Sequence, residues 1–516
     1  MKKSIMALVA LLYCTLLMSQ TEFDALKYVQ TDINGTARYM SMAGALGALG
    51  GDASAIKDNP AGLGIYRNSE LTGTINLLIQ QTSSDWNGVN TKENLTKIGF
   101  DNFSIVVAIP SKQGESGTKG LLSSNFSFSY NRLKNFDRSL TIKDKEGGSE
   151  SSMTDYMGNL TGNISKSDLT YTNDHNPLIS TDIPWLSVLA YNAGLIGKSQ
   201  TSWGSTLSGV PETVTPSYKL SEKGYVNEYS VGWAGNLSNF VYFGATANIQ
   251  SINYSSYGQF SEIFGSGGGM NLIDTITTRG NGLNFNFGAI VSPFKFLRLG
   301  VSFRTPTLFI LKDNYYSKLD FKTLSDTGSV STPGGISDYQ LKSPMQLNAS
   351  AAYLLGKKAV ISVEYDYSII TGSQLMSKTG DKQVFAEQNQ GIQDKLNDMH
   401  TLKIGAEYNI SDNFSVRAGF ANSNNTIKPD VTKILASNSI RTDPEYFIHK
   451  STNYITAGFG YQKENWFLDC AFQTSTYDEI FYSYSGEIGI GLALKPIPAN
   501  ITTTNNNLIL TVGYRF

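Results

Sequence analysis

The side chains best suited to acid–base chemistry or zinc binding in this sequence are its three histidines, His175, His400 and His449. They lie far apart in the chain, so neither a zinc cluster nor a histidine-based triad can be assembled from neighbouring positions. Of the two cysteines, Cys14 lies in an N-terminal export signal described below, which leaves Cys470 without a disulfide partner or a metal-ligand partner. We therefore expect no enzyme, no metal and no cofactor. A hydrolase is an alternative that needs a Ser-His-acid cluster brought together by the fold.

Nine charged side chains follow a different pattern, because each falls on the polar face of a segment that alternates apolar and polar residues. They are Arg298, Arg304, Glu364, Asp366, Lys403, Glu407, Arg417, Asp469 and Arg515. Five are basic and four are acidic. A selective ion filter needs a ring of charges of one sign, so this near-balance predicts ion pairs and hydrogen bonds between adjacent strands.

The segments that carry these charges alternate strictly over about ten residues, which is the signal of a transmembrane β-strand. In the first segment, Leu71, Ile75 and Ile79 share one face and Thr72 and Thr74 share the other. The predicted strands lie near residues 71–80, 103–109, 122–130, 226–236, 240–252, 283–292, 296–304, 344–354, 359–369, 400–409, 414–423, 452–462, 465–476 and 505–516. Their number, fourteen, is even, as single-chain bacterial outer-membrane barrels require. We predict an all-β fold, a transmembrane antiparallel β-barrel of about 14 strands.

The composition favours a membrane barrel over several soluble domains. Charged residues make up 16% and hydrophobic residues 40% of the 516 residues, with 28 Tyr and 26 Phe, whereas about 25% of the residues in soluble domains are charged. The mean hydropathy is −0.19, and no internal stretch reaches the roughly 20 apolar residues of a membrane helix. The formal net charge of −2, without a basic tract, predicts no nucleic-acid partner.

The one apolar stretch, residues 5–18, follows Lys2 and Lys3. It is too short for a bilayer and is typical of a secretory signal, so residues 1–19 are predicted to be a signal peptide. A lipoprotein signal at Cys14 is disfavoured, because Tyr13 stands where that processing needs a small residue.

The connections between the predicted strands alternate in length. Short turns are expected at residues 236–239, 292–295, 356–358, 411–413 and 463–464, with a longer turn at 110–120. Long polar loops join the hairpins at the other end; the largest spans residues 131–225, and within it a short helix is expected at 184–196. This pattern predicts periplasmic turns, extracellular loops and periplasmic termini for a barrel of residues 70–516.

The last strand closes the chain with alternating apolar residues. Leu508, Leu510, Val512, Tyr514 and Phe516 share one face. Such a strand ending on Phe resembles the signal read by the outer-membrane barrel assembly machinery. We therefore expect that machinery to be a partner that recognises Tyr514 and Phe516.

Residues 20–69 do not alternate and are rich in Gly and Ala. A compact segment before the first strand is expected to fold back into the barrel as a hatch, because a barrel this wide leaks without a plug. Two motifs, Gly-Asp-x-Ser-Ala and Asn-Pro-Ala-Gly-Leu, supply the candidate ligand and gating residues Gly51, Asp52, Ser54, Asn59, Pro60, Ala61, Gly62 and Leu63. Pro60 fixes φ and Asn59 caps its own backbone, which suits an architectural turn as well as a gate.

These motifs resemble the hatch of the FadL/TodX family of outer-membrane hydrocarbon transporters. The similarity continues in residues 286–288, 297–304, 402–408 and 416–420 and in the terminal strand, so it covers nearly the whole mature chain. The resemblance implies a fourteen-stranded barrel with an N-terminal hatch, in the outer membrane of a Gram-negative bacterium. The 131–225 loop departs from the family pattern.

The resemblance also implies passive uptake of long-chain fatty acids or other hydrophobic compounds. Extracellular loops would capture the ligand, an apolar pocket above the hatch would hold it, and it would leave through a hatch rearrangement or a lateral opening. The expected partners are a hydrophobic small molecule and outer-membrane lipids, and the chain is expected to be a monomer. Two alternatives are a scaffold barrel of a protein secretion system, favoured by a polar lumen without an apolar pocket, and haem uptake, for which no paired His or Tyr motif is present.

Overall fold

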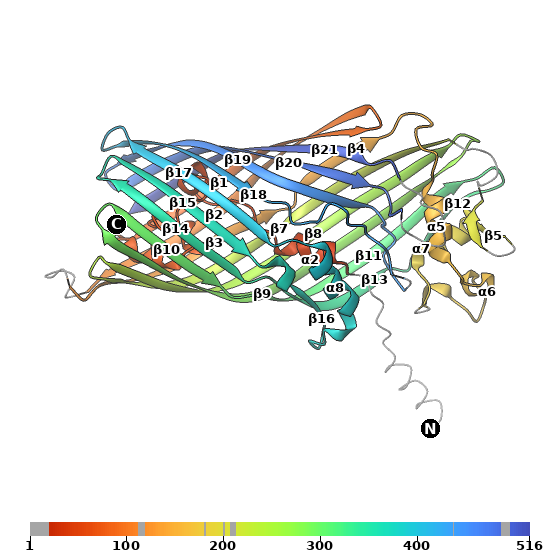
Figure 1. Ribbon diagram of the computed structural model, residues 1–516, viewed down its shortest axis with the longest axis horizontal. Coiled ribbons are helices and arrows are strands. Elements are labelled where there is room, and N and C mark those ends of the chain that lie inside the picture. Colours follow the sequence, from red (N-terminus) through yellow and green to blue (C-terminus); the bar gives the residue numbers. More distant parts are fainter. Residues whose placement is uncertain are drawn as a thin grey trace, which may run out of the picture.

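A computed structural model describes residues 20–111, 119–179, 182–199, 202–206, 213–436, 438–486 and 496–516. The predicted signal peptide, residues 1–19, lies outside these described residues. The described chain forms a long barrel, with the C-terminal end at the left in Figure 1 and most of the helices toward the right. Among the described residues, no helix is both long enough and apolar enough to cross a membrane.

Within the described residues, fourteen antiparallel strands close the barrel. In barrel order they are β1 (Glu70–Trp86), β2 (Val89–Pro110), β3 (Leu121–Asn135), β7 (Val214–Leu237), β8 (Val241–Phe264), β9 (Gly269–Phe294), β10 (Leu297–Arg304), β14 (Gln346–Leu355), β15 (Ala359–Ser368), β17 (Met399–Asn409), β18 (Phe414–Ser423), β19 (Tyr446–Lys463), β20 (Trp466–Tyr482) and β21 (Ala499–Arg515). The barrel closes where β1 pairs with β21, from Glu70 opposite Arg515 to Trp86 opposite Ala499. The predicted fold class and strand number are confirmed.

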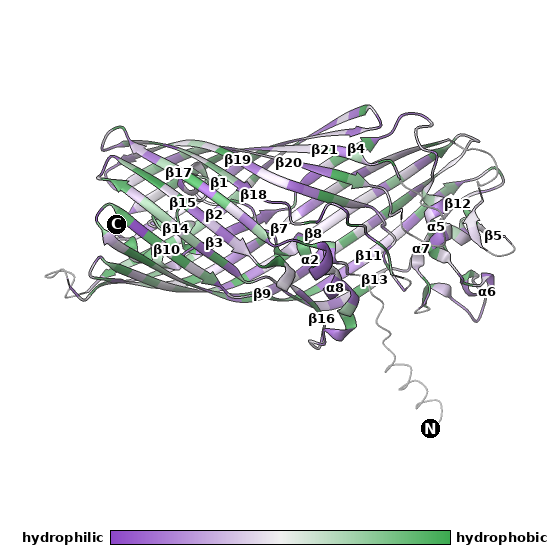
Figure 2. Ribbon diagram, in the orientation of Figure 1, coloured by the Kyte–Doolittle hydropathy of each residue, from purple (hydrophilic) through white to green (hydrophobic). Residues whose placement is uncertain are grey.

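The alternation along each strand decides which side chains face the lipid. On β1, Ile75 is 51% exposed whereas Thr74 is fully buried, and on β9 Leu283 is 50% exposed whereas Asn284 is buried. Figure 2 shows hydrophobic and hydrophilic residues alternating along the strands. Because the apolar side chains face outward and the polar ones face the lumen, the barrel is a transmembrane barrel.

The two ends of the barrel differ in their connections. The short turns predicted after residues 236, 292, 356, 411 and 463 are confirmed and lie at the same end as Phe516. At the other end, five further strands extend or line the wall: β4 (Arg138–Lys143), β11 (Leu308–Lys322), β12 (Thr327–Ser331), β13 (Gly335–Lys342) and β16 (Gln374–Ser377). We call the end with Phe516 and the short turns the short-turn end, and the opposite end the long-loop end.

The largest connection is shorter than predicted. Residues 131–135 and 214–225 of the expected 131–225 loop belong to β3 and β7. The alternation of hydrophobicity disappears there because the outward positions of β7 are polar, as at Lys219 and Lys223. The part of a strand that extends beyond the lipid therefore lacks hydrophobic alternation and resembles a polar loop in sequence.

The rest of this connection packs into a small cap at the long-loop end. It contains α5 (Met153–Thr161), α6 (Lys166–Leu169), η3 (Pro177–Ile179), α7 (Trp185–Asn192), β5 (Ile196–Lys198) and β6 (Trp203–Ser205). The helix predicted within residues 184–196 is confirmed as α7, whose Trp185, Leu186 and Leu189 are buried in the cap. Three further helical segments, η4 (Ile370–Gly372), η5 (Gln383–Phe385) and α8 (Ala386–Lys395), flank β16.

Residues 20–69 lie inside the barrel and contain α2 (Glu22–Val29), α3 (Ala37–Ser41), η1 (Ala55–Lys57) and η2 (Pro60–Ile65). Gln20 donates hydrogen bonds to Asp313 at 3.1 Å and to the hydroxyl of Tyr315 at 3.2 Å, both on β11. Glu70 and Phe516 therefore lie together at the short-turn end, as predicted for the termini of the barrel, whereas Gln20 lies near the long-loop end. The segment starts near the long-loop end and runs down the lumen before it enters β1.

Candidate functional site

The Gly-Asp-x-Ser-Ala motif builds a turn inside the hatch. Asp52 accepts hydrogen bonds from Thr36 Oγ1 at 2.8 Å and from the Ser54 amide at 2.9 Å. Ser54 Oγ accepts from the Thr36 amide at 2.8 Å, and Gly51 has a φ of +64°, which favours glycine. The contacts of this motif are therefore internal to the hatch.

The Asn-Pro-Ala-Gly-Leu motif attaches the hatch to the wall. Asn59 Oδ1 accepts from the Ala61 amide at 3.1 Å, while Asn59 Nδ2 donates to the carbonyl of Gly47 at 3.0 Å. Pro60 begins η2. A Cβ on Gly288 of β9 would lie 2.0 Å from Asn59 Oδ1, so a glycine in the wall allows the turn to approach closely.

The end of the same motif continues this attachment. Gly62 packs on Gly50, where a Cβ on Gly62 would lie 3.0 Å from the Gly50 Cα. The carbonyl of Leu63 accepts a hydrogen bond from Asn125 Nδ2 on β3 at 2.8 Å. None of the eight predicted hatch residues lines either of the two cavities described below, and their contacts support anchoring of the hatch; their role in ligand binding or gating stays a prediction.

The nine predicted lumen charges face inward, where many of them meet the hatch. Arg298 donates a hydrogen bond to the Leu49 carbonyl of the hatch at 2.7 Å. Arg304 pairs with Glu228 (2.6 Å), Lys403 with Glu364 and Asp366 (2.8 and 2.6 Å), and Arg515 with Glu70 (2.8 Å). Glu407 pairs with Arg38 and Arg417 (2.9 and 2.6 Å), and Arg417 also pairs with Asp469. Asp58 of the hatch lies 3.7 Å from Lys403. The charges are thus paired with one another and with the hatch.

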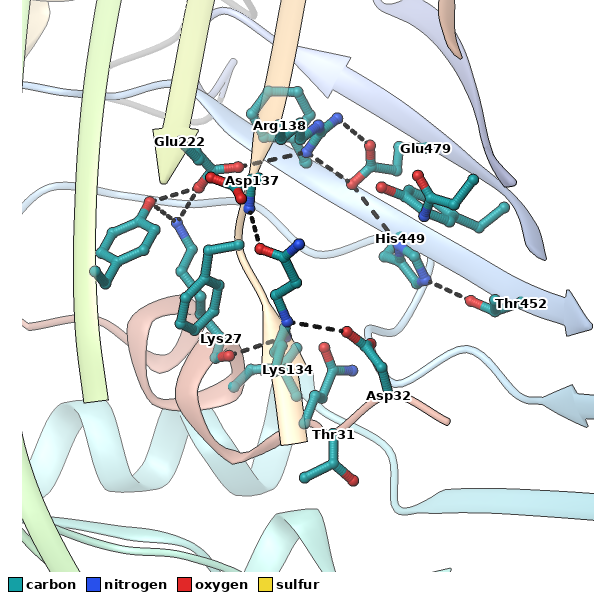
Figure 3. Close-up of a pocket in the computed structure, with 18 of the residues that line it drawn as sticks. Lys27, Thr31, Asp32, Lys134, Asp137, Arg138, Glu222, His449, Thr452 and Glu479 are labelled. Atoms are coloured by element: carbon teal, nitrogen blue, oxygen red, sulfur yellow. Dashed lines mark hydrogen bonds and ion pairs between the residues drawn. The ribbon is translucent and has the colours of Figure 1, made fainter. Parts of the chain in front are cut away.

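A cavity of about 360 Å³ lies between α2 and the wall, above the hatch. Figure 3 shows part of its lining, which comes from α2, the following segment and several strands. Small-molecule sites measure roughly 300–1,000 Å³, so the volume suits a small ligand. A second cavity of about 80 Å³ lies nearer the hatch and is lined by Lys57, Asp58 and Lys403. The two cavities share Asp32 and Tyr454.

Charged side chains line one part of the larger cavity (Figure 3). Lys27 of α2 pairs with Glu222 of β7 at 2.9 Å, and Arg138 of β4 pairs with Glu479 of β20. His449 Nδ1 lies 3.7 Å from Glu479 Oε1. These pairs could not be predicted from the sequence, because their members come from elements far apart in the chain.

Aromatic and aliphatic side chains line the rest of this cavity. Phe136 and Tyr254 pack edge to face with ring centroids 5.0 Å apart, and Tyr218, Phe447 and Leu220 lie nearby. The expectation of an apolar pocket is therefore corrected to an amphipathic one. The strands supply both kinds of lining at this level, with Glu222 beside Tyr218 and Leu220 on β7, and α2 adds Phe23 and Leu26.

Two cations on β3, Arg132 and Lys134, line this cavity; Asp101 and Asp32 are their acidic neighbours, beyond ion-pair distance. Among the described residues, no carboxylate lies within 4.0 Å of Arg132 or Lys134. Lys134 Nζ donates to the carbonyl of Lys27 at 3.0 Å, and Arg132 donates to Asn227 at 3.3 Å and to the hydroxyl of Tyr130 at 3.2 Å. These cations are available to an anionic group of a ligand.

The barrel wall is interrupted beside these cations. β2 pairs with β3 from residue 102 onward, whereas its residues 89–101 pair only with β1 in the described registers. Beyond β3 the chain turns inward and buries Phe136, and β4 continues along β7. Ile98 lines the cavity and is 82% exposed. The cavity therefore reaches the outer face of the barrel between β2 and β3.

Ion pairs anchor α2 at the long-loop end. Glu22 pairs with Lys395 of α8 at 2.6 Å, and Asp24 pairs with Arg441 at 3.0 Å. Burial alone would raise the pKa of Asp24, but the neighbouring Arg441 guanidinium holds this pKa below its usual value. Burial raises the pKa of Asp32, for which the described residues provide no ion-pair partner within 4.0 Å.

The three histidines do not meet. His175 lies in an exposed loop, and His400 stacks on Tyr367 with ring centroids 4.9 Å apart. His449 lies on β19 and lines the larger cavity. Its Nε2 lies 3.0 Å from Thr452 Oγ1. On the other side of the ring, Glu479 lies closer to Arg138, its ion-pair partner, than to His449.

The C-terminal aromatic residues lie on the outside at the short-turn end. Tyr514 packs against Trp466 with ring centroids 4.8 Å apart, and Phe516 is 63% exposed. Their recognition by the assembly machinery stays a prediction.

Comparisons with known proteins bear on the fold. No family model and no curated protein matches the sequence. The Pseudomonas putida toluene transporter TodX has a similar structure, with a TM-score of 0.51 and 11% identity over 94% of this chain and 99% of that chain. A Pseudomonas aeruginosa FadL homologue matches with the same identity and coverage and a TM-score of 0.50. The chain therefore has the fold of the FadL/TodX channels, and the predicted location in the outer membrane of a Gram-negative bacterium agrees with that fold.

Proposed function

We propose that this protein is an outer-membrane channel for the passive uptake of hydrophobic compounds, and that its ligands are amphiphiles with an anionic head, such as long-chain fatty acids. The observation that carries the proposal is the amphipathic cavity with the unpaired cations Arg132 and Lys134 at its edge. An apolar tail packs on Phe136 and Tyr254. The carboxylate binds the cations, because charge-assisted hydrogen bonds are the strong ones.

The interruption between β2 and β3 suits a sideways exit. The smaller cavity above the hatch is lined by charged groups such as Lys57, Asp58 and Lys403, and an apolar chain that passed there would strip these groups of water and partners. Through the wall opening, past Ile98, the tail moves from the cavity directly into the bilayer. The hatch then serves as a fixed floor for the cavity.

The second candidate is a binding or scaffold barrel of a protein secretion system, which the polar lumen around the hatch favours. Such a barrel binds no fatty acid. Haem uptake has less support, because His449 is the one histidine among the described residues that line the larger cavity.

The test is binding of a radiolabelled long-chain fatty acid to the purified full chain. The double variant Arg132→Gln/Lys134→Gln is expected to bind at least about tenfold more weakly, since it removes charge-assisted bonds to the carboxylate. Lys92→Gln, at an exposed position of β2 away from the cavity, is the matched control. Equal binding by the double variant and the control excludes the anionic-head proposal, and a folded wild-type protein that binds no fatty acid favours the scaffold candidate.

A further inference from the structure

The outer face of the wall carries a charged row beyond the lipid-facing belt, where β7, β8, β9, β11 and β13 lie side by side (Figure 1). One apolar row of the belt consists of residues opposite one another in register: Tyr229, Ile249, Leu283 and Leu308. Each of them is between 43% and 54% exposed. The outward row above it is mainly polar, with Asn227, Ser251 and Asn281, and ends in Ile310, which is 62% exposed.

Two cations stand directly opposite one another in the next outward row. Arg279 of β9 pairs in register with Lys312 of β11, and both are exposed. They share the outward parity of Leu283 and Leu308, with no break in the register between them. Like charges directly opposite on neighbouring strands destabilise a sheet, so an anion bound between them would stabilise it.

The protein itself supplies no such anion. Within the described residues, no carboxylate lies within 4.0 Å of Arg279 or Lys312. Asp338 of β13 is the register partner of Lys312 on its other side, but it is paired with Lys378 at 2.9 Å. Two more exposed or half-exposed cations face outward nearby, Lys223 of β7 and Lys342 of β13.

The depth of the pair identifies the anion. Lys312, opposite Arg279, lies two residues beyond the exposed Ile310 along β11. At a rise of about 3.3 Å per residue and a strand tilt of about 40°, this distance is about 5 Å along the membrane normal. The headgroup layer of a bilayer begins at the edge of the hydrocarbon and is several ångströms thick. Arg279 and Lys312 therefore lie at the level of lipid headgroups of the leaflet at the long-loop end.

We propose that Arg279 and Lys312 bind a phosphate group of a phosphorylated glycolipid in the outer leaflet, with Lys223 and Lys342 at the margins of the site. A phosphate between the pair relieves their repulsion, and the guanidinium fork of Arg279 suits phosphate oxygens. The acyl chains of the same lipid lie on the apolar row below, against Leu283 and Leu308. The site depends on the membrane placement of the barrel and not on transport, because neither Arg279 nor Lys312 lines the cavity.

The test is titration of the purified full chain in detergent with lipopolysaccharide, read by native mass spectrometry. Arg279→Gln/Lys312→Gln is expected to bind about thirty-fold more weakly than wild type, which corresponds to about five- to sixfold for each surface cation. The control Lys357→Gln/Lys358→Gln removes the same charge from an exposed turn at the short-turn end and is expected to bind like wild type. Unchanged fatty-acid binding and gel migration show that the double variant is folded.

Two further arms identify the source of the phosphate. Lipopolysaccharide stripped of its phosphates is expected to bind wild type as weakly as intact lipopolysaccharide binds the double variant, and inorganic phosphate at equimolar concentration is expected not to compete. Equal binding of intact lipopolysaccharide to wild type and double variant overturns the proposal. Full binding of the stripped lipid, or displacement by equimolar inorganic phosphate, overturns it as well.

Discussion

The amide of Gly47 in the hatch donates a hydrogen bond of 2.6 Å to Glu364 Oε2 on β15. Glu364 also pairs with Lys403 of β17 at 2.8 Å, and the carbonyl of Gly47 accepts from Asn59 at 3.0 Å. The backbone of Gly47 is thus hydrogen-bonded to the wall through its amide and to the Asn-Pro turn through its carbonyl. These contacts hold the hatch against the barrel wall.

Gly288→Ala tests whether close approach of the Asn59 turn to β9 seals the lumen. The new Cβ would lie 2.0 Å from Asn59 Oδ1, which forces the turn away at a cost of about 1–3 kcal/mol. We expect higher conductance in planar bilayers. Gly73→Ala is the control, because a Cβ there meets nothing within 4 Å. If both variants conduct alike, this contact does not seal the lumen.

Deletion of residues 20–60 removes α2 and most of the hatch. We expect a steadily conducting pore that admits large polar solutes, together with weaker fatty-acid binding, because α2 lines the cavity. Single-channel recording and uptake of a labelled long-chain fatty acid measure the two effects. Unaltered uptake by the deletion variant would argue against any gating role of the hatch.

Asp32→Asn is expected to stabilise the protein at neutral pH. Burial raises the pKa of Asp32, so the ionised carboxylate weakens the folded state. This loss is absent below the unfolded pKa of about 4 and grows as the pH rises through the raised folded value. The unfolding midpoint of the variant should exceed that of wild type at pH 7 and equal it at pH 3. A shift of the same size at both pH values contradicts this explanation; Glu150→Gln, at an exposed position, serves as control.

The closed sheet predicts heat-modifiable migration. The hydrogen bonds between β1 and β21 leave no free edge, and closed barrels of this kind lack a point at which unfolding begins easily. Unboiled protein should migrate differently from boiled protein on gels and give a β-type circular dichroism spectrum. Unchanged migration with a helical spectrum would rule out the barrel.

The strands within the lipid-facing belt could be predicted from the sequence because lipid imposes alternation, as at Ile75 and Thr74 of β1. Beyond the belt water meets the outer face, and polar residues such as Ser255 and Thr277 replace the apolar half of the pattern. The upper parts of β7, β8 and β9, and all of β11 and β13, were therefore missed. Their register follows from neighbouring strands and not from any local signal.

The charges that hold the hatch were found because they share the parity of the strands, as Glu364 and Lys403 do. The residues that line the cavity could not be predicted, since Lys27, Arg138 and Lys134 come from segments without alternation or with a bulge. For His449, the register shifts between this residue and Thr452, so parity cannot predict which face the imidazole occupies. The position of α2 near the long-loop end follows from ion pairs across hundreds of residues, such as that of Asp24 with Arg441.

Uptake of a radiolabelled long-chain fatty acid by cells that produce the full chain tests the channel function most directly, with cells that lack the chain as reference. We expect faster uptake with the wild-type chain and with Lys92→Gln, and uptake near the reference rate with Arg132→Gln/Lys134→Gln. Equal rates in cells with and without the wild-type chain, at verified levels of folded barrel in the outer membrane, would contradict a role in uptake.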